Sequence, residues 1–145
     1  MFIRQVNNGK GIASYYIESN GESAIIDPLP EVATYDELNQ KHNAELKYIF
    51  STQLNLDTVD TIARLHQETG ASAVYGPIPD DYSFPYLAKD FELFTLGGTM
   101  IRVLHTPGHR LESVCYLLLN KAYQPHAIFT GDTLFSLGCG RIFEG

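Results

Sequence analysis

Basic residues are few in this sequence, and they form no cluster. Ten Lys and Arg residues stand against 17 Asp and Glu residues, giving a formal net charge of −7. A protein that binds the phosphate backbone of a nucleic acid needs a concentrated positive surface. Nucleic acid is therefore not an expected partner.

The sequence also lacks a long apolar run and a disulfide framework. No stretch approaches the roughly 20 apolar residues that span a bilayer, and the chain turns polar at 7–10, before a signal-peptide core could form. Cys115 and Cys139 are the two cysteines, and they lack Cys-x-x-Cys spacing. We expect free thiols, no membrane association and a cytoplasmic location.

Short apolar segments separated by Gly, Pro and Asn predict the strands. Asn20-Gly21 is a typical hairpin turn, and Gly97-Gly98 predicts a second hairpin. The stretch 78–89, beyond Gly76-Pro77, has neither a helical nor a strand period, so we expect a loop there. The predicted strands cover residues 13–17, 23–27, 46–50, 72–75, 91–95, 100–104, 113–119 and 127–130.

Two helices are predicted in the first half of the chain. Thr34 and Glu37 have the spacing of a capping box, which predicts a helix from Thr34 toward His42. Apolar side chains at helical spacing predict a second helix, with Asp57 as its N-cap and Gly70 as its stop. With 145 residues, 44% of them hydrophobic, the chain fits a single α/β domain over 1–145.

Four strings along the chain resemble one enzyme family. Thr-Pro-Gly-His at 106–109, Phe-Thr-Gly-Asp-Thr-Leu-Phe at 129–135 and the string at 138–145 resemble consecutive motifs of glyoxalase II. The opening, at 15–22 and 25–28, is similar to the persulfide dioxygenases. The resemblance implies a metallo-β-lactamase-type αββα sandwich, here truncated at the C-terminal side, with its metal site at one edge.

The metal ligands of that family are only partly present. Its hallmark is His-x-His-x-Asp-His after a strand, followed by the His of Thr-Pro-Gly-His, the Asp of Gly-Asp-Thr and a last His. In this chain Gln53, Asn55 and Thr58 stand where the hallmark has histidines, and the last His has no counterpart before Gly145. The resemblance leaves Asp57, His109 and Asp132 as vestigial metal ligands.

These residues predict at most one weakly bound divalent metal ion. A catalytic zinc takes three protein ligands and keeps an open position for water, and amide oxygens replace imidazole poorly. Asp57, His109 and Asp132 could hold one zinc or iron ion loosely, whereas a binuclear centre is not expected. In the mononuclear pattern of the persulfide dioxygenases the matching positions are Gln53, His109 and Asp132, so one of two histidines is missing.

Structural roles are the alternatives for the same residues. We favour Asp57 as a helix N-cap, while for His109 and Asp132 a hydrogen-bonded pair between two turns and a metal site both stay open. Arg141 matches a basic position that approaches glutathione in glyoxalase II, although we favour an ordinary surface arginine. His42, His66, His105 and His126 show no ligand spacing.

A homodimer is the expected assembly. Truncation at the C-terminal side would leave apolar side chains without a covering layer, namely those of Leu134, Phe135, Ile142 and Phe143. The predicted function is a degenerate member of the family that lacks hydrolase and dioxygenase activity and acts by binding or assembly. The alternative is a mononuclear metal-dependent hydrolase acting on a thioester or glutathione conjugate; the sequence identifies no small-molecule ligand.

Overall fold

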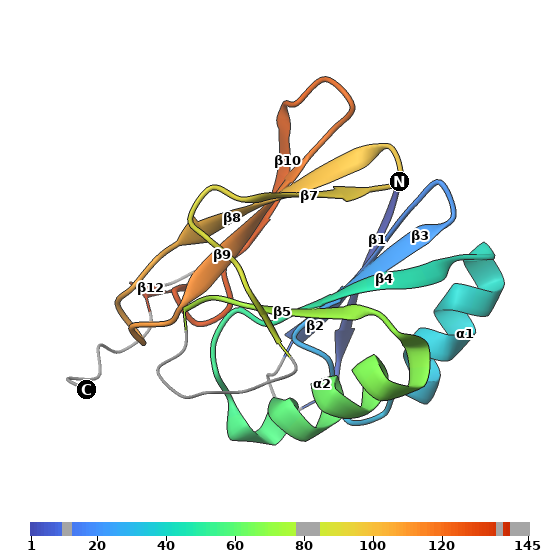
Figure 1. Ribbon diagram of the computed structural model, residues 1–145, viewed down its shortest axis with the longest axis horizontal. Coiled ribbons are helices and arrows are strands. Elements are labelled where there is room, and N and C mark those ends of the chain that lie inside the picture. Colours follow the sequence, from blue (N-terminus) through green and yellow to red (C-terminus); the bar gives the residue numbers. More distant parts are fainter. Residues whose placement is uncertain (10–12, 78–84, 136–137, 140–145) are drawn as a thin grey trace.

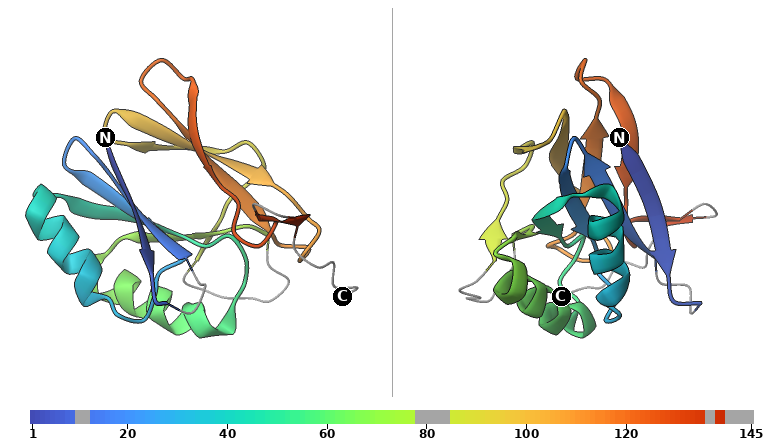
Figure 2. Two further views of the ribbon diagram at one scale, coloured as in Figure 1. Left: turned by 180° about the vertical axis from the view of Figure 1, so that it is seen from behind. Right: turned by 90° about the vertical axis from the view of Figure 1, so that its right-hand side faces the viewer.

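Two β-sheets pack face to face, and two helices cover the outer face of the larger sheet (Figure 1). The computed structural model describes residues 1–9, 13–77, 85–135 and 138–139. These residues form three layers, with helices, a six-stranded sheet and a four-stranded sheet in that order, as the side view in Figure 2 shows. The predicted α/β class is confirmed.

The six-stranded sheet mixes antiparallel and parallel pairing. Its strands lie in chain order: β1 (Phe2–Asn7), β2 (Ala13–Ser19), β3 (Glu22–Ile26), β4 (Glu45–Phe50), β5 (Ser72–Tyr75) and β6 (Tyr86–Leu87). The first three strands pair antiparallel, whereas β3 to β6 pair parallel. Parallel neighbours need a crossover, and the helices α1 (Ala33–His42) and α2 (Leu56–Thr69) supply two of them.

The four-stranded sheet is antiparallel throughout. It consists of β7 (Leu93–Leu96), β8 (Thr99–His105), β9 (Val114–Leu119) and β10 (Pro125–Phe129), in the spatial order β10-β9-β8-β7. A further short pair, β11 (Leu134–Phe135) and β12 (Gly138–Cys139), follows it.

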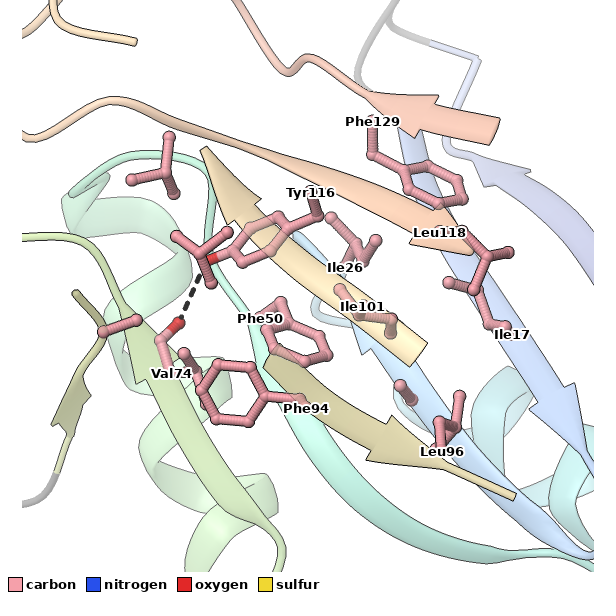
Figure 3. Packing of buried hydrophobic residues seen from close by; sticks show 14 residues of the cluster. Ile17, Ile26, Phe50, Val74, Phe94, Leu96, Ile101, Tyr116, Leu118 and Phe129 are labelled. Atoms are coloured by element: carbon pink, nitrogen blue, oxygen red, sulfur yellow. Dashed lines mark hydrogen bonds between the residues drawn. The ribbon is translucent and has the colours of Figure 1, made fainter. Parts of the chain in front are cut away.

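The main core lies between the two sheets (Figure 3). Phe50 of β4 is at its centre, with ring centroids 5.5 Å from Phe94 of β7 and 4.7 Å from Tyr116 of β9. A second cluster joins the other face of the six-stranded sheet to the helices through side chains such as Tyr35 and Ile62. Because strand side chains alternate between faces, each central strand of the six-stranded sheet contributes to both clusters.

The predicted hairpin turn at Asn20-Gly21 and the predicted end of the second helix at Gly70 are confirmed. Asn20 (φ 49°) and Gly21 (φ 82°) form the turn between β2 and β3, as expected for a hairpin that needs two left-handed residues. Gly70 (φ 75°) ends α2, because glycine adopts the left-handed C-terminal position without a Cβ penalty.

Both predicted helix N-caps are wrong. Helix α1 begins one residue earlier than expected, with Val32 at the N-cap and no side-chain cap, so Thr34 already lies in the first turn. The N-cap of α2 is Asn55, whose side chain accepts a hydrogen bond from the backbone N–H of Asp57. Asn55 and Asp57 are both residue types that cap helices well, and Asn55 is the one with the extended backbone of an N-cap (φ −123°, ψ 119°).

Four of the described strands were missed by the sequence-based prediction, namely β1, β6, β11 and β12. The stretch 78–89 was expected to be a loop; residues 78–84 lie outside the described residues, and Tyr86–Leu87 forms β6 by pairing with Val74 and Tyr75 of β5. Strand β1 (Phe2–Asn7) pairs along β2 at the opposite edge. Strands β1 and β6 are edge strands, whose conformation depends on the neighbouring strand more than on their own periodicity.

Neither described helix is long and apolar enough to cross a membrane.

Candidate functional site

Three loops meet at one edge of the two sheets. They follow β4, β8 and β10, and they comprise residues 51–55, 106–113 and 130–133. The backbone N–H of Val114 donates to the carbonyl of Thr52 at 2.8 Å, and the N–H of Leu54 donates to Oε1 of Glu112 at 3.3 Å. These bonds hold the loop after β4 against the loop after β8.

Asp27, at the end of β3, anchors the loop after β4. Its Oδ1 accepts from the backbone N–H of Thr52 at 2.8 Å, and its Oδ2 accepts from the Thr52 hydroxyl at 2.7 Å. Asp27 has φ 52°, a left-handed conformation that Asp tolerates better than most residues. The carboxylate is thereby turned toward the loop and away from the strand direction.

The environment of Asp27 makes its carboxyl group less acidic. Burial raises the pKa of Asp27 to about 6, the two hydrogen bonds from Thr52 oppose that change, and the negative charge of Asp132 adds to it. Desolvation favours the neutral form of a carboxyl group, whereas hydrogen bonds donated to the carboxylate favour the charged form. Asp27 therefore holds the loop after β4 in place through Thr52, and its pKa responds to the charge of Asp132.

Gly131 brings the turn after β10 against the same threonine. Its φ of 53° lies in the left-handed region, and a Cβ at this position would collide with the side chain of Thr52. Only glycine allows this approach without displacement. Thr52 therefore links Asp27 on one side to the turn that carries Asp132 on the other.

Gln53, His109 and Asp132 come together at the surface end of this arrangement. The amide Nε2 of Gln53 donates to Oδ2 of Asp132 at 2.8 Å, and Nε2 of His109 lies 3.7 Å from the same oxygen. The side chain of His109 is 14% exposed and that of Asp132 is 45% exposed. We call Gln53, His109 and Asp132, with Asp27 and Thr52 beneath them, the candidate site.

A hydroxyl contact ties together the turns that carry His109 and Asp132. Oγ1 of Thr106 lies 3.4 Å from Oγ1 of Thr133 and 3.4 Å from Sγ of the buried Cys115. The Thr-Pro-Gly-His turn and the Gly-Asp-Thr turn are thus adjacent through their threonines. This places the predicted pair, His109 and Asp132, side by side.

Three further positions of the family's His-x-His-x-Asp-His motif, Asn55, Asp57 and Thr58, lie at the start of α2. Oδ1 of Asn55 accepts from the N–H of Asp57 at 2.9 Å, and the hydroxyl of Thr58 donates to the carbonyl of Asn55 at 3.0 Å. Asp57 is exposed in the first turn of the helix, where a negative charge interacts favourably with the helix dipole. These three residues are therefore engaged in helix initiation.

The donor set does not fit the metal centre that the family resemblance implies. Within residues 1–9, 13–77, 85–135 and 138–139, no three His, Cys, Asp or Glu side chains are grouped to hold a metal ion. At the first hallmark position an amide N–H points at Asp132, whereas a metal ligand would present a lone pair. Metal ligation by Asp57, His109 and Asp132 stays a prediction.

His66, His105 and His126 have ordinary structural surroundings, whereas Nε2 of His42 is buried without a hydrogen-bond partner among the described residues. Nδ1 of His66 lies 2.7 Å from the carbonyl of Ala71, Nε2 of His105 lies 3.2 Å from the carbonyl of Ala88, and His126 is exposed. The ring of His42 packs 4.2 Å from that of Phe2. Arg141, Ile142 and Phe143 lie outside the described residues, as do the side chains of Leu134 and Phe135.

Three residues that support the site were not singled out from the sequence. Asp27 and Thr52 were only parts of longer strings, and the nearly buried Glu112 was not considered. A usable signal existed for Asp27, because a carboxylate directly after a buried apolar strand and before a proline is an unusual place for a solvated charge. No comparable local signal marks Thr52 or Glu112.

Comparison with other proteins gives homologues over nearly the whole chain. A hydroxyacylglutathione hydrolase from Pseudoalteromonas translucida is 35% identical, and the match covers 97% of this chain and 54% of that protein. A cytoplasmic hydroxyacylglutathione hydrolase from Arabidopsis thaliana is 36% identical over 91% of this chain and 52% of its own length. The chain thus spans about half the length of the curated relatives it matches, and no family model matches it.

Solved structures match the fold closely. A metallo-β-lactamase from Staphylococcus aureus superposes with a TM-score of 0.90 at 25% identity, covering 99% of this chain and 47% of that one. The ETHE1 protein from Myxococcus xanthus gives 0.82 at 26% identity, covering 97% and 61%.

Proposed function

The chain has the metallo-β-lactamase fold and hydroxyacylglutathione hydrolases as homologues, and on that premise we propose that it binds a thioester or glutathione conjugate without hydrolysing it. Hydrogen bonds would take the place of the metal centre at the candidate site. In this view the chain retains the fold and the ligand class of its relatives, and not their chemistry.

One observation carries this proposal, namely the hydrogen bond from Nε2 of Gln53 to Oδ2 of Asp132. A carboxylate beside a metal ion has its charge compensated by that ion, whereas here an amide N–H donor faces the carboxylate. Asn55, at the next hallmark position, uses its amide oxygen to cap α2. The side chains at both positions are thus engaged in hydrogen bonds with the protein itself.

We infer the ligand class from the homologues. The exposed carboxylate of Asp132 in the candidate site could bind such a ligand. The carboxylate of Asp132 is 45% exposed and can pair with an ammonium group or an amide N–H. Glutathione conjugates offer both of these donors. A charge-assisted hydrogen bond to such a ligand requires no metal.

The test combines binding and turnover on the same protein. We expect a hydroxyacylglutathione thioester to bind in isothermal titration calorimetry after chelator treatment, with no thioester cleavage when zinc or iron(II) is added. Asp132→Asn should weaken binding by about tenfold through loss of a charged hydrogen bond. Asp57→Asn is the matched control, since it removes a charge from the exposed first turn of α2 and should leave binding unchanged.

The second candidate is a single-metal hydrolase, favoured by the proximity of His109 to Asp132. An imidazole and a carboxylate on neighbouring turns are two of the three ligands that a catalytic ion needs. Zinc-dependent thioester cleavage that disappears in His109→Ala would establish this candidate and overturn the non-hydrolytic proposal.

A cytoplasmic location and a homodimer remain parts of the proposal. The location follows from the two cysteines without disulfide spacing, and cell fractionation tests it. The homodimer was expected from side chains that lie outside the described residues, and sedimentation velocity over a range of concentrations tests it.

A further inference from the structure

An open polar pocket lies at the end of β4 that is remote from the candidate site. Its volume is about 450 Å³. Strand β4 begins beside this pocket and ends, six residues later, at the loop of the candidate site, so about 20 Å of strand separates the two. Figure 1 shows α1, whose last turn borders the pocket, on the opposite side of the molecule from β12. We call it the amide pocket, and its lining residues are Gly21, Asn39, Gln40, Asn43, Ala44 and Glu45.

Backbone hydrogen bonds fix the walls of the amide pocket. Asn43 ends α1 in the left-handed conformation, with φ 49°. The N–H of Ala44 donates to the carbonyl of Asn39 at 2.9 Å, and the N–H of Glu45 donates to the carbonyl of Gly21 at 2.9 Å. The end of α1 is thereby tied to the turn between β2 and β3, so the pocket is formed before any ligand binds.

Two buried hydroxyl groups set the orientation of the Asn39 side chain. Its Oδ1 accepts from the hydroxyl of Ser23 at 2.6 Å and from the hydroxyl of Tyr16 at 2.9 Å. A separation of 2.6 Å is usual for O–H···O and too short for N–H···O, so the carboxamide oxygen faces the hydroxyls. Burial raises the pKa of Tyr16 above its ordinary value of 10, so this hydroxyl keeps the proton that it donates.

The nitrogen of the same carboxamide is available to a ligand. Within the part of the chain that the structure describes, both hydrogen bonds of the Asn39 side chain go to Oδ1 and none involves Nδ2, which solvent reaches. A carboxamide nitrogen carries two N–H donors. Since Oδ1 is held from below, these donors have a fixed direction at the pocket, and fixed donors lower the entropy cost of binding.

The other lining groups restrict the chemistry of the ligand. Gln40 and Asn43 are exposed amides, which both donate and accept hydrogen bonds. Glu45 contributes a carboxylate, and Nζ of Lys47 lies 3.4 Å from it. Among the described residues that line the pocket there is no cationic and no aromatic side chain. A phosphate or carboxylate ligand therefore lacks a counter-charge, and an apolar ligand lacks a contact surface.

Hydroxyl groups match this set of donors and acceptors. The C-terminal end of α1 carries a partial negative charge, so it and Glu45 favour donors on the ligand, whereas Nδ2 of Asn39 requires an acceptor. An ammonium group has only donors, while a hydroxyl group has both. The volume lies within the range of about 300–1,000 Å³ that is typical of small-molecule sites.

We propose that the amide pocket binds a neutral polyhydroxylated molecule of monosaccharide size. Its hydroxyl oxygens accept from Nδ2 of Asn39, and its hydroxyl hydrogens are donated to the carboxylate of Glu45. Tyr16 and Ser23 are positioning residues, because they hold Asn39 and do not touch the ligand. This second site is separate from the candidate site and does not depend on the ligand proposed there.

The test is a titration of the full chain followed by nitrogen-15 NMR. The probes are methyl α-D-glucopyranoside, which is a sugar ring, and D-mannitol, which is an open-chain polyol. We expect saturable shifts of the Asn39 side-chain NH₂ signals and of the Gly21 and Ala44 backbone amides, with a Kd of about 1–10 mM. Shifts with both probes would assign the site to spaced hydroxyls in general, and shifts with the glucoside alone would assign it to a sugar ring.

Two results would overturn the proposal in the unchanged protein. One is the absence of a saturable shift at these signals with either polyol. The other is tighter binding of methylammonium chloride or sodium phosphate than of both polyols at the same signals and equal ionic strength, which would identify an ion site.

Asn39→Asp isolates the donor that the proposal requires. It keeps an oxygen for both buried hydroxyls and replaces only Nδ2, so we expect the glucoside to bind at least about tenfold more weakly. Asn7→Asp is the matched control, since Asn7 is exposed on β1 and its Oδ1 also accepts a hydrogen bond, from the N–H of Gly9. This control should leave the affinity unchanged. An equal affinity in Asn39→Asp and Asn7→Asp would refute the site.

Two further variants keep the test independent of the folding of Asn39→Asp. Asn43→Gly removes a lining amide at a left-handed position that glycine adopts readily, and we expect about threefold weaker binding. Ser23→Ala should move the Asn39 NH₂ signals of the free protein and weaken the glucoside, with the backbone signals of β4 unchanged. Unmoved NH₂ signals would show that Ser23 does not orient Asn39, and unchanged affinity in Asn43→Gly would count against the pocket.

Discussion

The side-chain amide of Gln53 and the carboxylate of Asp132 are joined by a 2.8 Å hydrogen bond across 79 residues of sequence. The bond connects the loop after β4 to the turn after β10, so it closes the candidate site between the two sheets. In the related metalloenzymes a histidine is expected at the position of Gln53. The amide places a hydrogen-bond donor where the family resemblance implies a metal ligand, and the proposed binding role is argued from this contact.

Restoring the hallmark histidines should create a metal site. The triple change Gln53→His, Asn55→His and Thr58→His adds three imidazoles beside His109 and Asp132. We expect about one zinc ion per chain to survive dialysis, measured by inductively coupled plasma mass spectrometry, and less than a tenth of that in the unchanged protein. Gln67→His, on the exposed face of α2, is the control. Equal zinc content in the triple variant and the control would contradict this reconstruction.

Gly131→Ala should destabilise the protein. The new Cβ would collide with the side chain of Thr52, and φ of 53° is unfavourable for alanine, so we expect a loss of about 2–4 kcal/mol in the free energy of unfolding. Gly108→Ala is the comparison, because a Cβ there meets no atom within 4 Å. Its expected change is within about 0.5 kcal/mol. Urea denaturation measures both, and similar losses would refute the close approach.

Asp27 should make stability depend on pH in one direction. Its pKa is about 6 in the folded chain against an ordinary value of 3.8, so the folded state binds a proton more tightly than the unfolded state. The stabilisation is therefore present below about pH 4 and is lost as the pH rises through 6, by at most about 3 kcal/mol. Asp27→Asn removes this component. The difference in unfolding free energy between the two proteins, followed from pH 4 to 7, should show the decline; a flat difference would show that the pKa is ordinary.

The two candidate caps of α2 should differ in their contribution to stability. Asn55→Ala removes the side-chain acceptor for the N–H of Asp57 and should lower the free energy of unfolding by about 1 kcal/mol. Asp57→Asn removes only a charge that favours the helix dipole, so we expect a loss of about 0.5 kcal/mol. Thermal denaturation followed by circular dichroism compares them. A larger effect at Asp57 would restore the cap that the sequence predicted.

Several elements were predictable because the information for them is local. Asn20-Gly21 requires a turn with two left-handed residues, and Gly70 permits the left-handed end of α2. Alternating and helical apolar patterns located most strands and both helices. The strings around His109 and Asp132 indicated the family, which the homologues and the fold confirm.

Other features depend on contacts that a single segment does not encode. Strand β6 exists because β5 offers a free edge to Tyr86 and Leu87. The raised pKa of Asp27 requires the burial that both sheets create together, and the hydrogen bonds that oppose it come from Thr52, 25 residues away. Thr34 was a plausible cap by its spacing, but the N-cap lies two residues earlier, at Val32.

The sequence by itself determined the type of fold, the turns, and the loss of imidazole at Gln53, Asn55 and Thr58, because these are properties of residue identity and local spacing. Only the tertiary structure decided what the replacements do. It placed the amide of Gln53 against Asp132, engaged Asn55 at the start of α2, and oriented the carboxamide of Asn39 through two buried hydroxyl groups. Hydrogen-bond partners and burial are set by the packing of distant segments, so they follow from the folded chain as a whole.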